Sequence, residues 1–134
     1  MKGINHAAVV VTVILHQALG FLWYGALFFN PWLGGLGKKP PDINQSDPLP
    51  FVLDIVGWFL ASYVMAWLIR RTNTDSPGWG ALLGAVLWLG LAVPALVPDY
   101  AFAGLKPMVT VIDAADVLVA CVMTGAILAA WRKK

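Results

Sequence analysis

The stretch MVTVIDAADVLVACVMTGAILAAW, residues 108–131, decides the fold of this chain. It contains only two charged side chains, Asp113 and Asp116, and the basic residues 132–134 stop it. A helix needs about 20 apolar residues to cross the roughly 30 Å hydrocarbon core of a bilayer. The stretch is therefore long enough and apolar enough to be a transmembrane helix.

Three further apolar runs precede it, at about residues 5–29, 51–69 and 79–97. They lack the alternation of barrel strands, and only helices or closed barrels satisfy every backbone group in lipid. The first run is too long for a secretory signal peptide, and no small-residue cleavage site follows, so we expect it to be retained. The sequence predicts an all-α integral membrane four-helix bundle that forms a single domain over residues 1–134.

The overall composition agrees with this interpretation. Of 134 residues, 60% are hydrophobic and 12% are charged, whereas a soluble domain has about 25% charged residues. So few charges could not cover the surface of a small chain in water. This excludes an ordinary soluble enzyme, a disordered tail and a nucleic-acid binder.

Basic residues predict the orientation, because cytoplasmic loops carry an excess of Lys and Arg. One side would carry six of them and the other side three, which places both termini in the cytoplasm. The first group is Lys2, Arg70, Arg71, Arg132, Lys133 and Lys134, and the second is Lys38, Lys39 and Lys106. The predicted location is the inner (plasma) membrane of a bacterium.

Aromatic residues near the expected span ends are predicted to anchor the two membrane interfaces, where amphipathic rings settle at headgroup depth. The inner anchors are Trp67, Trp79 and Trp131, and the outer ones are Trp23, Tyr24, Trp32, Tyr100 and Phe102. The outer loop, residues 31–50, contains five prolines and is expected to be extended and stiff.

Ionisable residues within the spans form the candidate site, since each one costs at least about 2.5–3.5 kcal/mol at the centre of a helix. At about 1.5 Å per residue, His16 lies near the midplane and Asp54, Asp113 and Asp116 lie in the outer half. These four residues could line a path for protons or cations, or a site for a small cationic ligand. We favour a specific pairing for Asp116 and His16.

A structural alternative stays open for the same residues. The three carboxylates could reach headgroup water and merely set the depth of their helices. His16 and Gln17 could hydrogen-bond across helices as part of the packing.

Small residues predict the helix contacts, because close backbone approach holds helices together in lipid. The candidates are Gly20, Gly57, Gly80, Gly84 and Gly125. A weak internal similarity relates residues 19–25 to residues 83–90, each with a tryptophan after a glycine. Pro94 is expected to kink the third span.

The sequence lacks the residues that several kinds of binding or catalytic site require. No Cys or His cluster has metal-ligand spacing, and His6 and His16 share one helix and so cannot clamp a haem from opposite sides. Cys121 is the single cysteine, and no phosphate-binding loop or serine elbow occurs. We therefore expect no enzymatic activity, no metal and no cofactor.

Asn5, the motif Gly20-x-x-Trp23-Tyr24, Phe28 and Trp32 resemble the opening of the bacterial membrane proteins of "domain of unknown function 1761". The resemblance covers most of the chain. It implies a small four-helix membrane protein of bacterial origin and carries no activity or catalytic residue with it.

Two functions remain open at this point. The first is a self-associating transporter or channel-like unit for protons, cations or a small ligand. The second is an accessory or assembly subunit of a larger membrane complex, with the small-residue faces as its interface. The expected partners are the lipid bilayer and either a second copy or that complex, and no nucleic acid.

Overall fold

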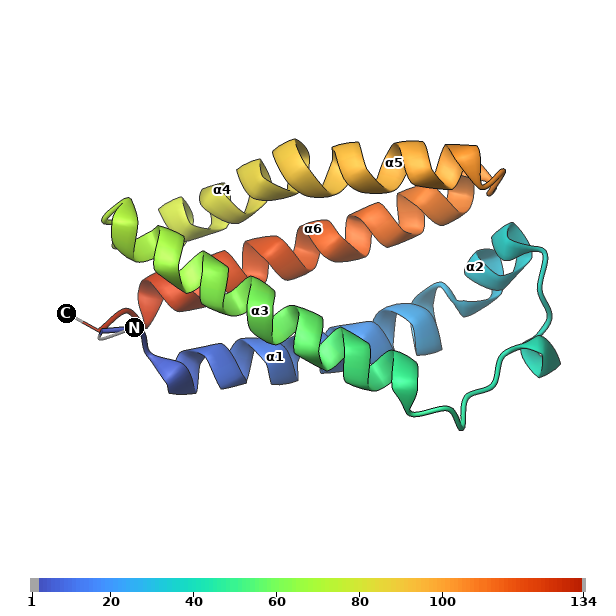
Figure 1. Cartoon of the computed structure of the whole chain (residues 1–134), viewed down its shortest axis with the longest axis horizontal. Coiled ribbons are helices and arrows are strands. Elements are labelled where there is room, and N and C mark those ends of the chain that lie inside the picture. Colours follow the sequence, from blue (N-terminus) through green and yellow to red (C-terminus); the bar gives the residue numbers. More distant parts are fainter. Residues whose placement is uncertain (1–2, 134) are drawn as a thin grey trace.

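The computed structural model describes residues 3–133, which fold into helices and contain no strand (Figure 1). Lys2 and Lys134, which contribute to the predicted orientation, lie outside these residues. The elements in chain order are α1 (His6–Gly20), the π-helix η1 (Phe21–Leu27), α2 (Phe29–Leu36), the 3₁₀ turn η2 (Pro40–Asp42), α3 (Leu49–Arg71), α4 (Pro77–Leu87), the π-helix η3 (Trp88–Ala92), α5 (Val93–Phe102) and α6 (Pro107–Ala130).

Four helical segments are long and apolar enough to cross a membrane: His6–Leu27, Leu49–Arg71, Pro77–Phe102 and Pro107–Ala130. The expected all-α bundle of four such segments is thereby confirmed. The N-terminus, the C-terminus and the α3–α4 turn share one end of the bundle, here called the terminal end. The opposite end, called the loop end, holds α2, the loop 37–48 and the α5–α6 turn (Figure 1).

The third segment extends beyond the predicted end at residue 97, because the helix continues through Pro98 to Phe102. Membrane helices tolerate proline, because neighbouring helices and local adjustments of the helix satisfy the few backbone groups that proline leaves without a partner. The irregularity expected near Pro94 takes the form of η3, in which the Val93 N–H donates to the Trp88 carbonyl. This i→i+5 bond defines a π-helical turn.

The predicted extended outer loop is wrong for its first part, which forms α2. Pro31 stands in the first turn of this helix, where a backbone N–H has no intrahelical partner to lose. Leu33 and Gly35 are buried, and a Cβ on Gly35 would overlap the Val109 side chain of α6. Contact with α6 and a left-handed Gly37 (φ 68°) that ends the helix explain the difference.

Helix α6 is central, because it contacts α1, α2, α3, α4 and α5. Its most extensive contact is with α4, where Gly80 and Gly84 face Gly125 and Cys121. A Cβ on Gly80 would collide with the Gly125 carbonyl oxygen, and one on Gly84 with the Cys121 carbonyl oxygen. The two backbones therefore touch.

The predicted contacts at Gly20 and Gly57 are not formed among residues 3–133. A Cβ on either residue would meet nothing within 4 Å. Each glycine lies on a part of its helix, α1 or α3, that faces away from the neighbouring helices of the chain. Helix packing among the described residues relies on the α4–α6 glycines instead.

Candidate polar site beside helix α6

One stripe of α6 faces the other helices, and both of its aspartates belong to this stripe. The buried residues of α6 recur every three or four positions, as expected for one face of a helix; they are Val109, Ile112, Asp113, Asp116, Ala120, Thr124, Gly125, Leu128 and Ala129. At the terminal end the stripe meets an apolar core that includes Val9, Met65 and Ile69. The two aspartates lie in the half nearer the loop end, where the bundle interior becomes polar.

Asp113 is held by two tyrosines from different elements. Tyr24 of η1 donates to one carboxylate oxygen at 2.6 Å, and Tyr100 of α5 donates to the other at 2.8 Å. The sequence predicts both tyrosines as interface anchors, but their hydroxyl groups point inward to α6. Asp113 thus ties three elements together, a structural role different from the contact with headgroup water that the structural alternative gave it.

Two tryptophans bind α6 on either side of Asp113 in the sequence. Trp23 of η1 donates its indole N–H to the Ile112 carbonyl at 3.0 Å. Trp88 of η3 donates in the same way to the Ala114 carbonyl at 2.8 Å. The weak similarity between residues 19–25 and 83–90 therefore has a structural counterpart, and it was the signal that could have identified Trp88 as a site residue.

Asp54 on α3 accepts hydrogen bonds from α1. His16 Nε2 lies 3.3 Å and 3.2 Å from the two carboxylate oxygens, and Gln17 donates to one of them at 2.6 Å. The imidazole of His16 stacks on Trp58, with ring centroids 3.9 Å apart. Sequence reasoning missed Trp58, because nothing along α3 distinguishes it from a lipid-facing tryptophan.

Asp116 differs from the other two carboxylates. Its side chain is 6% exposed, and its Oδ1 atom has no hydrogen-bond partner among residues 3–133. His16 Nδ1 is likewise buried without a partner. The predicted pairing of Asp116 with His16 is not formed among the described residues: Nε2 bonds Asp54, and Nδ1 does not reach Asp116.

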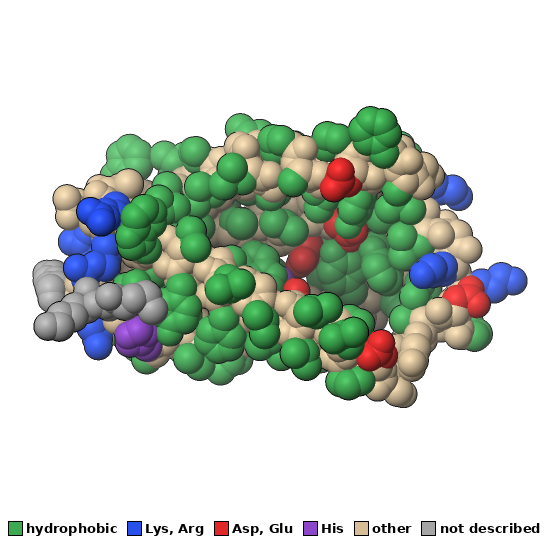
Figure 2. Space-filling view, viewed as in Figure 1, with side chains coloured by type: hydrophobic (Ala, Val, Ile, Leu, Met, Phe, Trp, Pro, Cys, Tyr) green, Lys and Arg blue, Asp and Glu red, His purple; other side chains and the backbone are tan. Residues whose placement is uncertain are grey.

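Acidic side chains gather along a hollowed part of the face between α3 and α5, whereas Lys and Arg lie at the two ends (Figure 2).

Of the predicted anchors, Trp67, Trp79 and Trp131 are at least half exposed at the terminal end. Trp32 packs edge-on against Tyr24, with centroids 5.2 Å apart.

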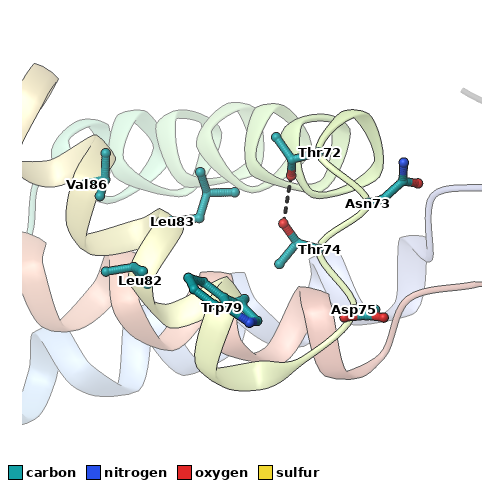
Figure 3. A pocket seen from close by; sticks show the side chains of 8 residues that line it. All are labelled: Thr72, Asn73, Thr74, Asp75, Trp79, Leu82, Leu83 and Val86. Carbon is teal, nitrogen blue, oxygen red and sulfur yellow. Dashed lines mark hydrogen bonds between the residues drawn. The ribbon is translucent and has the colours of Figure 1, made fainter.

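A separate pocket of about 440 Å³ lies at the terminal end, against the α3–α4 turn (Figure 3). Trp79, Leu82, Leu83 and Val86 of α4 form its apolar wall, and residues 72–75 form its polar rim. In the rim, the hydroxyls of Thr72 and Thr74 hydrogen-bond to each other at 2.7 Å. No buried polar atom without a partner belongs to its lining residues among those described, so the polar site is the stronger candidate.

The carboxylates of the polar site can balance a positive charge within helical segments that are otherwise apolar. Within the described part of the chain, no group of three or more His, Cys, Asp or Glu side chains is placed to bind a metal ion. Among residues 3–133, the buried atoms of the site without a partner are Asp116 Oδ1 and His16 Nδ1.

These features define a multi-pass helical membrane protein whose spans enclose a polar site. The family model described as "Protein of unknown function (DUF1761)" matches residues 7–129. The chain belongs to this family, as its opening motif indicates. Nothing among curated proteins or solved structures matches it.

Proposed function

We propose that this protein moves protons or other cations across the plasma membrane of a bacterium, with Asp116, Asp54 and His16 as the path and Asp113 as the residue that positions its walls. The observation that carries the proposal is the buried Asp116 carboxylate, whose Oδ1 has no partner among the described residues. An aspartate at mid-helix costs a few kcal/mol in lipid. Most buried polar atoms in proteins are paired, and among the four described side-chain atoms that are not, Asp116 Oδ1 is the only carboxylate oxygen.

The other two carboxylates, Asp113 and Asp54, differ from Asp116 because they have hydrogen-bond partners. Asp113 receives tyrosine hydroxyls on both oxygens, as a structural carboxylate does, and Asp54 is bonded by His16 and Gln17 of α1, which links it to the imidazole of the path. Asp116 and His16 Nδ1 retain capacity for a proton or a ligand. Histidine is suited to proton exchange at physiological pH.

Self-association is part of the proposal, because four short helices enclose little volume. Gly20 and Gly57 lie on the adjacent helices α1 and α3, and a Cβ added to either would meet nothing within 4 Å, which leaves room for a second copy. In an accessory subunit, we would expect the small-residue faces to contact a larger complex. The α4–α6 glycines instead pack against each other within the chain. Native mass spectrometry in a mild detergent tests this, with a homo-oligomer as the expected result.

Flux into proteoliposomes tests the transport itself. Purified protein is reconstituted with a pH-sensitive dye inside the vesicles, and proton or alkali-cation gradients are imposed in turn. We expect flux above that of protein-free vesicles, and a loss of about tenfold or more in Asp116→Asn, as removal of one charge-assisted contact predicts.

Asp99→Asn is the matched control, because Asp99 is an exposed carboxylate on α5. It should retain the flux of the unmodified protein. Absence of flux from the unmodified protein, or equal flux in Asp116→Asn, would contradict the proposal.

A further inference from the structure

We propose that the polar site takes an organic monocation, an ammonium-type or phosphonium-type ion with an apolar body, which binds at the Asp116 carboxylate. This inference rests on the proposed function and names its ligand class. It follows from four features of the site: the carboxylate oxygens without partners, the unpartnered nitrogen of His16, the aromatic side chains nearby, and the way α3 is packed.

The number of free oxygens argues against a small metal cation as the ligand. Mg²⁺ and Ca²⁺ require six or more oxygen ligands in close geometry. Both oxygens of Asp113 accept tyrosine hydroxyls, and both oxygens of Asp54 face His16 or Gln17. The Asp116 carboxylate remains, whose buried Oδ1 atom has no partner among residues 3–133, and one carboxylate matches a single positive charge that needs no coordination shell.

A second unpartnered group lies in the same part of the bundle. His16 is 4% exposed, and its Nδ1 atom has no partner among residues 3–133. The ring is fixed on one side by Asp54 and on one face by Trp58. A rigid imidazole with an unused nitrogen indicates a place kept for a polar group, since native proteins pair nearly all buried polar atoms.

Aromatic side chains supply the apolar and cation-attracting walls. Trp23, Tyr24, Trp88 and Tyr100 all hydrogen-bond α6 between Ile112 and Ala114. Aromatic rings attract organic cations through their quadrupole, most strongly where water is excluded. Hydrogen bonds fix these side chains around Asp113, one helix turn from Asp116, so little order has to be created when a ligand binds there.

The packing of α3 leaves a lateral approach to the site. α3 packs against α1 and α6 and has little contact with α4. The side chain of Asp54, 44% exposed, lies on this helix, and the face between α3 and α5 is hollowed and acidic (Figure 2). An apolar cation that partitions into the bilayer could reach Asp116 from this side.

Binding of tritiated tetraphenylphosphonium to the purified full chain in detergent tests the inference. We expect saturable binding that unlabelled tetraphenylphosphonium displaces and that NaCl or MgCl₂ at the same concentration does not. Asp116→Asn should weaken the affinity by about tenfold or more, while Asp99→Asn should leave it unchanged. Trp58→Leu should weaken it also, and Trp67→Leu, an exposed tryptophan of the same helix, should not.

Asp116→Asn is nearly isosteric, and its fold is checked by circular dichroism and size-exclusion chromatography. Non-saturable binding to the unmodified protein, or equal binding by a folded Asp116→Asn variant, would overturn the inference. If flux in proteoliposomes depends on Asp116 but tetraphenylphosphonium does not bind, the organic ligand is wrong and the proposed transport stands. If saturable, Asp116-dependent binding occurs without any flux, the ligand class stands and transport falls.

Discussion

Asp113 and Asp116 stand one turn apart on α6 and have opposite surroundings. Asp113 receives hydroxyl donors from Tyr24 and Tyr100, which belong to elements 89 and 13 residues away in the sequence. Asp116 keeps an oxygen without a partner among the described residues. One carboxylate therefore joins the elements around the site, and the other is the residue to which we assign the proposed ligand.

Removal of either tyrosine hydroxyl tests the role of Asp113. Tyr24→Phe and Tyr100→Phe should each lower the free energy of unfolding by about 0.5–2 kcal/mol, the range for interhelical hydrogen bonds in membranes. Thermal unfolding in a mild detergent measures this. Tyr63→Phe, which removes an exposed bond to His6 at 2.9 Å, is the control and should cost less. Equal losses for all three variants would show that the Asp113 bonds carry no special weight.

At the scale of elements, two π-helical segments accompany the site. η1 carries Trp23 and Tyr24, and η3 carries Trp88, and all three side chains bond α6. A π-turn shifts the side chains that follow it around the helix axis, so it can direct residues that a regular helix would turn elsewhere. π-turns are frequent at functional sites for this reason.

The α4–α6 contact yields a prediction about helix packing. Gly84→Ala should destabilise the protein by about 1–3 kcal/mol, because the new Cβ must displace backbone rather than a flexible side chain. Gly57→Ala makes the same change in α3 where space is open, and it should be neutral or stabilising by up to about 1 kcal/mol. Denaturation in detergent distinguishes them. A destabilised Gly57→Ala would instead indicate that a second copy packs at this glycine.

At the scale of the whole molecule, the two halves of the bundle differ in character. The terminal half has an apolar core and an end rich in arginine, with Arg70, Arg71 and Arg132. The half nearer the loop end holds the polar site, with Lys38, Lys39 and Lys106 beyond it. A site that lies in one half of the bilayer is closer to one aqueous side, so the direction of insertion decides which side supplies its ligand.

Cysteine labelling measures that direction. In a Cys121→Ser background, a membrane-impermeant maleimide should label Gln45→Cys on intact cells and Asp75→Cys only after permeabilisation. The expected result follows from the greater number of basic residues at the terminal end. The opposite pattern would place the termini outside, and labelling of both positions on intact cells would indicate two orientations.

The sequence by itself determined the four spans, because crossing a bilayer depends on length and hydropathy within each segment alone. It also determined that His16, Asp54, Asp113 and Asp116 are the ionisable residues needing an explanation, since charge in a span is costly wherever it occurs. Only the tertiary structure decided their partners. His16 bonds Asp54 rather than Asp116, and Tyr24 reaches Asp113.

The difference between properties of a single segment and tertiary packing also explains why the expectations for the outer loop and for the glycine contacts were wrong. α2 forms because α6 offers a surface for Leu33 and Gly35, which the local proline content does not reveal. Gly80 touches Gly125 while Gly57 faces open space, although both glycines lie in apolar helices. Each of these outcomes depends on how helices cross, and that is settled by the simultaneous packing of all side chains around α6, which no single segment encodes.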